Sequence, residues 1–456
     1  MSDSIRLFYE EQTVHEQAVS RTGILHTPIG DFEVPGAMPS LRTLTDLQAV
    51  RLNMDAGLNL RMVSPYSSQV ASFGRDFDEM FWPHQTRLIT VPRPLVLADL
   101  ESEALNFNCT ARANYRRLDG AARSVEQGGA MDILMRTGAT TDSRHDSIEA
   151  HSAWHRVERE FGFGPLMDWT VRRLAAVRSD VLFVPTPIVM RDPTTAEDAL
   201  RIGEQMLPLA RRAMQTQFRM HGLHFLIRAE VFDSSPRSVR SRIALRNGLI
   251  SMGARGIIRG LFLSVKLDDQ QKLLSDQDRG RIVRRNLSEF LTELQQCAQL
   301  SDSVLVAFGV GNRALGFLDS GTDIVSVRLT GRNGIDRIFK GRQGEVPDHV
   351  VPPITMPRTM VDEDPERVRR VYDEKGAFPV PSCLTPQPYW NFPQRDQWRY
   401  VARARCGVFL DLSAEYLEAA KDKSKPLSEA VASRVNDAGN RQELIDMCPS
   451  IREEGM

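Results

Sequence analysis

Between residues 180 and 330, short apolar runs alternate with amphipathic stretches. The amphipathic stretches carry apolar residues at helical spacing, as at Leu200, Leu207 and Met214. Strands that alternate with helices of ten to twenty residues predict parallel βαβ units. The apolar runs have the composition of buried strands and read "DVLFVPTPIVM", "HFLIRAEVF", "ARGIIRGLFLSV", "SVLVAFGVG" and "TDIVSV".

Two earlier apolar segments, 58–65 and 93–99, supply further strands, and no dinucleotide-type glycine fingerprint follows the early strands. We therefore predict an α/β fold, a (β/α)8 TIM barrel over residues 1–345. Glycine-rich punctuation marks residues 100–178 as an inserted region. Residues 346–456 are predicted to form a C-terminal extension, with a proline-rich connection that is extended over 343–400 and a small helical subdomain.

Composition narrows the class of protein only moderately. The chain has 456 residues, of which 41% are hydrophobic and 26% charged, with a net charge of −1. Such a balance is typical of a globular protein with a sizeable core and offers no overall basic field for a polyanion. Widely spaced cysteines, an acidic N-terminus and the lack of a long apolar run predict a reduced, cytoplasmic protein with no membrane partner. The excess of arginine over lysine reflects either genome composition or phosphate recognition.

One late stretch carries the best candidates for chemistry. The segment "SGTDIVSVRLTGRNG" (320–334) has the form of a buried strand whose C-terminal end opens into a site, with Asp323, Ser326 and Arg328 as its inward candidates. Just before it, "GVGN" presents Gly309 and Gly311 after an earlier strand, where barrel enzymes often bind phosphate. A tight turn between strand and helix is the competing interpretation.

These motifs, taken with the N-terminus, resemble tRNA-guanine transglycosylases. Residues 21–66, "RTGILHTPIGDFEVPGAMPSLRTL…", are similar to the family's R-x-G-x-L-x-T-P-x-G opening, which forms an N-terminal hairpin before a helix and the first barrel strand. Residues 308–334 are similar to its G-V-G…G-V-D-M-F-D-C-V…A-R-N-G segment, and "RPLVLADLE" to its R-P-I-L-T-D-S-G-G segment. The resemblance implies a (β/α)8 barrel that handles guanine or 7-deazaguanine bases.

The resemblance also implies roles for individual residues. Asp99 takes the position of an active-site aspartate, as general acid/base or sugar contact, although it could instead cap the following helix. Ser326 takes the position of the family's attacking aspartate, and Asp323 takes the position of the family's other aspartate. Because Asp323 lies three positions before Ser326, strand alternation points its side chain to the opposite face. Because serine is a poor glycosyl acceptor without an activating base, transglycosylation by the family's mechanism is doubtful here.

Base-reading positions differ from the family as well. Thr186 replaces the base-recognition aspartate, and Arg228 or Glu230 replaces a glutamine beside the base, with alternation pointing one of the two inward. The family's G-G-L-A-x-G-E strand becomes "IRGLFLSVKLDD", which keeps Gly260 and loses the glutamate. An arginine where amides stood favours an anionic or phosphorylated ligand.

No metal or other cofactor is predicted. The family's zinc ligands, C-x-C-x-x-C and a distant histidine, cannot be assembled from Cys383 and Cys406. In "HSAWH", His151 and His155 share a helix face, but the glutamate of an H-E-x-x-H motif is missing, so we favour a solvated segment over a metal site. The stretch 395–405, "RDQWRYVARAR", fits a nucleic-acid contact and an exposed helix face equally well.

Two functions stay open at this point. The first is a divergent, zinc-free relative that binds a guanine or 7-deazaguanine base or a nucleic acid. The second is an active enzyme, a pentosyltransferase that exchanges or releases a base on tRNA, DNA or a nucleoside. Zinc-free relatives of this family occur in bacterial antiphage defence clusters such as type IV CBASS. The resemblance therefore also implies a protein partner from a defence operon and a homodimer.

Overall fold

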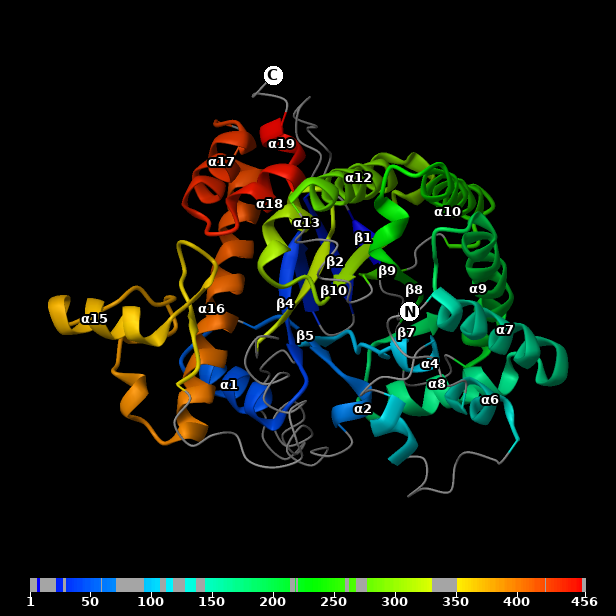
Figure 1. Cartoon of the computed structure of the whole chain (residues 1–456), viewed down its shortest axis with the longest axis horizontal. Helices are drawn as coiled ribbons and strands as arrows, with labels where there is room; N and C mark the ends of the chain where they lie inside the picture. Colours follow the sequence, from blue (N-terminus) through cyan, green and yellow to red (C-terminus); the bar gives the residue numbers. More distant parts are fainter. Residues whose placement is uncertain are drawn as a thin grey trace.

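A curled, parallel β-sheet with helices around it organises the chain in the computed structural model (Figure 1). The structure describes residues 6–8, 22–27, 30–58, 60–70, 94–106, 112–117, 128–136, 144–213, 218, 220–258, 262–267, 277–329, 351–422 and 424–452. The sheet strands are β4 (Gly36–Leu41), β5 (Met62–Pro65), β6 (Leu95–Val96), β7 (Val181–Pro185), β8 (Met220–Ile227), β9 (Phe262–Leu267), β10 (Val304–Phe308) and β11 (Ile324–Arg328). The predicted α/β class is confirmed.

The order of the strands is β6-β5-β4-β11-β10-β9-β8-β7, and every neighbouring pair is parallel. Hydrogen bonds also join the two strands at the ends of this order. The Asp180 N–H donates to the Val96 carbonyl over 2.8 Å, and the Val96 N–H donates to Asp180 Oδ2 over 2.9 Å. The sheet therefore curls far enough to bring β6 beside the start of β7.

Helices cover the outer side of the sheet (Figure 1). Helix α1 (Leu44–Asp55) and the long α16 (Gln394–Lys421) pack on each other and on β4. The described helices of the middle of the chain are α2 (Ser67–Val70), α4 (Glu103–Asn106), α6 (Ala130–Arg136), α7 (Arg144–Phe161), α8 (Gly164–Ala176), α9 (Pro193–Ala213), α10 (Pro236–Ala254), α12 (Gln277–Gln296) and α13 (Ala314–Asp319). Short 3₁₀ turns lie at η1 (Ala229–Phe232), η2 (Ala298–Leu300), η3 (Gly311–Arg313) and η4 (Tyr389–Asn391).

An antiparallel sheet of β1 (Arg6–Phe8), β2 (Gly23–Thr27) and β3 (Gly30–Val34) contains the predicted N-terminal hairpin, since β2 and β3 pair directly. The prediction missed β4, which we expected to belong to the hairpin region. Strand β4 instead pairs with both β5 and β11 in the main sheet. Its sequence "GAMPSL" is buried at every position and has no β-branched residue, so neither alternation nor composition marks it as a strand.

The predicted inserted region 100–178 contains helices α4, α6, α7 and α8. Helix α15 (Pro365–Lys375) interrupts the proline-rich 343–400, which we expected to be extended. Local signals explain α15: Asp364 caps it by accepting from the Glu366 N–H over 2.8 Å, Pro365 takes its first turn, and Gly376 ends it at φ 69°. Short strands β12 (Ile354–Thr355) and β13 (Asp362–Glu363) precede it. The division of the chain at residue 345 stays a prediction.

The C-terminal part has an aromatic core of its own beside the main one. Tyr389 and Tyr400 stack with ring centroids 5.4 Å apart, and Phe378 packs edge-on against Tyr389 at 6.3 Å. Ile354, Val368, Val401 and Ala404 complete this buried cluster. Aromatic packing therefore holds this part of the chain together.

Helices α17 (Leu427–Asp437), α18 (Arg441–Met447) and α19 (Pro449–Arg452) are the last described helices. Helix α18 packs against α12 and α13, and α17 and α19 pack against α18 (Figure 1). Buried Asp319, at the end of α13, anchors α19. Its carboxylate accepts from the Ser450 N–H over 3.1 Å, from Ser450 Oγ and from the Tyr416 hydroxyl. Burial raises the pKa of Asp319 from 3.8 to about 6, because desolvation outweighs these hydrogen bonds.

The Asp319 carboxyl should make the stability of the protein depend on pH. The folded state keeps the proton where the unfolded state has lost it, so stability is greatest below the ordinary pKa and falls as the pH rises from 3.8 to about 6. We expect this fall to be about 3 kcal/mol and to be absent from an Asp319→Asn variant. Urea unfolding of both proteins between pH 4 and 7 measures it. Parallel profiles for the two chains would contradict the assignment.

Candidate functional site

Polar and charged side chains gather where the parallel strands end. Tyr66 follows β5, Asp99 follows β6, Arg228 follows β8, Gly309 follows β10, and Arg328 ends β11. Because all these strands run in the same direction, their carboxyl ends meet at one edge of the sheet. This edge is where a parallel α/β sheet presents a ligand site, and it is the candidate site of this chain.

Asp99 lies in this edge, fully buried. Its N–H donates to the Pro65 carbonyl over 2.9 Å, which continues the pairing of β5 and β6 past their ends. Its carboxylate accepts from the Glu101 N–H over 2.7 Å. That bond is of the kind by which an aspartate stabilises a turn two residues on. Asp99 therefore stabilises the turn that precedes α4, close to the capping role that the sequence suggested. The role of Asp99 in a ligand site stays a prediction.

Glu101 is a residue that the sequence interpretation missed. It is 5% exposed, and its Oε2 accepts from the Ser68 N–H over 3.0 Å. Its backbone has φ 54°, a conformation that residues other than glycine seldom adopt and that is concentrated at functional sites. Asp99 and Glu101 therefore form a pair of buried carboxylates two residues apart. Glu101 lies in the stretch "ADLES", which shows no strand-like alternation, so the sequence did not indicate which way its side chain points.

Tyr115 contacts the backbone between Asp99 and Glu101. Its hydroxyl donates to the Leu100 carbonyl over 2.7 Å and contacts Ser67 Oγ. Burial, with the negative charge of Glu101 as the second cause, raises the pKa of Tyr115 well above its usual 10. Tyr115 is thus held as a neutral donor. The Arg42 guanidinium lies 5.0 Å from the centroid of the Tyr66 ring, and the Tyr66 backbone pairs with that of Asp99, so a cation and an aromatic ring lie beside this pair.

Ser326 lies inside the sheet, fully buried on β11. Its hydroxyl is hydrogen-bonded to the hydroxyl of Ser40 on the neighbouring strand β4, and its carbonyl accepts from the Val310 N–H over 3.0 Å. A serine needs an adjacent base to act as a nucleophile, and a second serine hydroxyl does not supply one. The hydrogen bond to Ser40 therefore suits a structural role for Ser326 better than a nucleophilic one.

Arg328 and Gly309 lie against each other at the end of β11. A Cβ at Gly309 would lie 3.3 Å from two guanidinium nitrogens of Arg328, and Gly309 has φ +70°. Only glycine suits both the backbone conformation and this close approach. Gly311 begins η3 with φ +58° and has open space around it. The "GVGN" segment is thus a tight turn that brings the Arg328 guanidinium over the backbone, at the site edge.

Asp323 lies at the other end of β11, the amino-terminal edge of the sheet. Its Oδ2 accepts from the Leu305 N–H over 2.7 Å, and its own N–H donates to the Leu305 carbonyl over 3.0 Å. Asp180 makes the same pair of bonds to Val96. Both aspartates therefore join the starts of neighbouring strands, and the structure does not bring Asp323 together with Asp99.

The predicted base-reading residues have mixed positions. The Thr186 hydroxyl donates to the His224 carbonyl over 3.0 Å, and its methyl group lies towards Gly203 of α9, behind the sheet. Arg228 directly precedes the turn η1, and Glu230 lies within it. Arg228 Nε and Glu230 Oε1 are 3.8 Å apart. The prediction that strand alternation separates them is wrong, because β8 ends at Ile227. Gly260 lies outside the described residues.

The arginine-rich stretch 395–405 forms the first part of α16 and packs inwards. Arg399 donates to Gln48 over 2.8 Å and Arg403 to Asn53 over 2.9 Å, both on α1. Arg405 is 6% exposed. The interpretation as an exposed helix face is therefore wrong for Arg399, Arg403 and Arg405, which bind within the protein, whereas Arg395 is exposed.

No protein-family model matches this chain, and no curated protein matches it. Fold and site together define the class as an α/β protein with a parallel sheet whose carboxyl edge carries buried carboxylates and arginines. None of the helices in the described ranges is long and apolar enough to cross a bilayer.

Proposed function

We propose that this chain is a divergent relative of tRNA-guanine transglycosylases that binds a guanine or 7-deazaguanine base at the carboxyl edge of the sheet, without glycosyl transfer by the family's mechanism. One observation carries the proposal. At the position that the resemblance gives to the family's attacking aspartate, Ser326 is fully buried and bonded to Ser40, and Arg328 ends the same strand at the candidate site. A site with this composition suits binding better than covalent chemistry.

We also infer that the sheet closes into a complete (β/α)8 barrel. The two hydrogen bonds between Asp180 and Val96 support closure, since they join the two strands at the ends of the sheet order. The eight parallel strands separated in sequence by helices also favour it. In a closed barrel Asp99 and Arg328 would face one shared mouth, with β4 and β5 between their strands.

The chemistry of guanine fits the residues at this edge. The Watson–Crick edge of guanine donates from N1–H and the 2-amino group, and carboxylates such as those of Asp99 and Glu101 accept such bonds strongly. Guanine O6 is an acceptor that arginine recognises, which suits Arg328 or Arg228. A nucleic acid or phosphorylated ligand would use the same arginines.

Calorimetric titration with 7-deazaguanine tests the binding proposal. We expect saturable binding by the intact chain, weaker binding of adenine, which lacks the N1–H donor, and a loss of affinity of roughly tenfold or more in Asp99→Asn. Asp437→Asn, which changes an exposed ion pair with Arg358, is the matched control and should bind normally. Equal affinity for both bases, or an unchanged Asp99→Asn variant, would overturn the proposal.

The alternative function is base exchange on tRNA, DNA or a nucleoside. The paired carboxylates Asp99 and Glu101 favour it, because glycosyl transfer with retention needs two carboxyl groups. Incubation with isotope-labelled guanine and each nucleic acid distinguishes the two. Our proposal predicts no incorporation, whereas incorporation that disappears in Asp99→Asn would establish the enzyme.

A further inference from the structure

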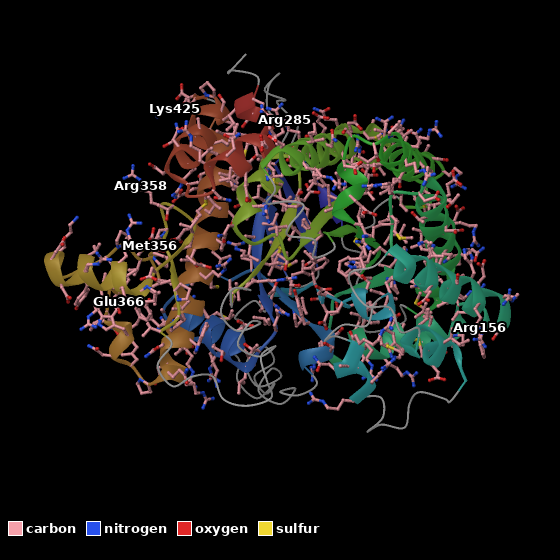
Figure 2. The ribbon with its side chains drawn as sticks, in the orientation of Figure 1. Arg156, Arg285, Met356, Arg358, Glu366 and Lys425 are labelled. Carbon is pink, nitrogen blue, oxygen red and sulfur yellow. The ribbon has the colours of Figure 1, made fainter. Side chains whose placement is uncertain are left out.

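Two histidines and an aspartate meet where α7 packs beside α9, away from the carboxyl edge just described. His151 and His155 lie four residues apart on α7 and so share one face of that helix. Asp198 reaches them from the first turns of α9. One ligand atom from each residue lies within 4.8 Å of the others. Arg156, labelled in Figure 2, marks this part of α7 at the outer edge of the molecule.

The ring nitrogens are arranged around one carboxylate oxygen. His155 Nε2 lies 3.0 Å and His151 Nδ1 lies 3.9 Å from Asp198 Oδ2. In a tetrahedral zinc site with bonds of about 2.0–2.1 Å, neighbouring ligand atoms are roughly 3.3 Å apart. Small side-chain rotations therefore suffice to place all three atoms on one ion.

Other contacts orient these groups. His151 Nε2 lies 2.6 Å from the Ile188 carbonyl, which can only accept, so Nε2 carries the proton and Nδ1 offers its lone pair towards Asp198. Metal-binding histidines commonly use their second nitrogen in this way. On the aspartate, Oδ1 accepts from Arg201 over 3.3 Å, which leaves Oδ2 directed at the imidazoles.

His151 is the buried member of the cluster, with a side chain 10% exposed. His155, with a side chain 44% exposed, leaves the cluster open to solvent on one side. The sequence prediction of a solvated segment holds for His155 and is wrong for His151.

We propose that His151 Nδ1, His155 Nε2 and Asp198 Oδ2 bind one divalent metal ion of the zinc class, with water in the open position. Two imidazoles and a carboxylate are a ligand set of this class. The site would join α7 to α9 and, through the Ile188 carbonyl, hold the segment that follows β7. It goes beyond the proposed base binding and does not depend on it. The competing arrangement is an ion-pair network of His155, Asp198, Arg201 and Glu158.

Titration of the chelator-treated full chain with Co²⁺, followed by visible absorption, tests the site. We expect one Co²⁺ per chain with the intense d–d bands of a four-coordinate ion, displaced by Zn²⁺. His155→Gln and Asp198→Asn should each weaken binding by roughly tenfold or more. His155→Gln alters a half-exposed side chain, so the variant should fold, which its circular dichroism can verify.

His26→Gln is the matched control, because His26 Nδ1 also pairs with an aspartate, Asp31, at 2.8 Å but belongs to no cluster of three potential metal ligands among the described residues. It should bind Co²⁺ like the unaltered chain. A second readout is the melting temperature, which Zn²⁺ should raise in the unaltered chain and in His26→Gln but not in His155→Gln. Absence of Co²⁺ bands, or equal binding by His155→Gln, would overturn the proposal.

Discussion

A chain with methionine in place of Arg405 is expected to lose about 3 kcal/mol of its free energy of unfolding. Arg405 is buried on α16, and its guanidinium donates to the Arg328 carbonyl over 2.7 Å, to Asp362 over 2.7 Å and to Asn312 over 2.8 Å. Methionine preserves the packing of the stem but leaves these acceptors without their donor. Loss of one partner of a buried pair costs far more than loss of an exposed one.

The effect of Arg405→Met should also reach the candidate site. Arg405 joins the carboxyl end of β11 and the "GVGN" turn to the C-terminal part of the chain. We therefore expect weaker 7-deazaguanine binding even where the variant is folded, because Arg328 loses its backbone support. Arg358→Met is the matched control, since the Arg358 side chain is 75% exposed and labelled in Figure 2 at the surface. Equal losses of stability in the two variants in urea unfolding would contradict this account.

The second large effect is expected at Arg284 of α12. Its guanidinium donates to Asp446 Oδ2 from Nη2 over 2.7 Å and from Nε over 3.1 Å, and the aspartate side chain is fully buried. Arg284→Met leaves a buried carboxylate without its closest cation. We expect a loss of about 3–5 kcal/mol in the free energy of unfolding, measured by urea denaturation.

Two further variants separate the buried pair from its surroundings. Arg281, whose side chain is 53% exposed, lies 3.6 Å from Asp446 Oδ1, so Arg281→Met should cost less than about 1 kcal/mol. The double variant Arg284→Met/Asp446→Leu removes both charges and should recover much of the lost stability. A double variant no more stable than Arg284→Met would show that packing between α12 and α18, rather than charge, sets the loss.

The sequence predicted those parts of the fold that local patterns determine. Helices α9 and α12 carry clear helical periodicity, and strands such as β7 and β10 are continuous apolar runs. The N-terminal hairpin followed from the resemblance. Strand β4 was missed because it is buried on both faces and carries Pro39 and Gly36. The inward packing of α16 was missed because arginines at positions such as 399 and 403 appear exposed until their partners on α1 are known.

For the candidate site, the sequence indicated Asp99 and Arg328 at strand ends, and the structure places both at the same edge. It could not indicate Glu101, since a positive φ and a hydrogen bond to Ser68 leave no trace in residue type. Likewise Asp198 joins His151 and His155 from more than 40 residues away, a contact that only the packing of α7 beside α9 creates. Such long-range contacts depend on tertiary structure, which spacing along the chain does not encode.

The most direct test of the central claim is a crystal structure of the full chain soaked with 7-deazaguanine. We predict the base at the carboxyl edge of the sheet, hydrogen-bonded to Asp99 and within reach of Arg328, with Ser326 still bonded to Ser40 and no covalent link to the protein. A base bound elsewhere, or an edge that stays closed to it at saturating concentration, would contradict the proposal.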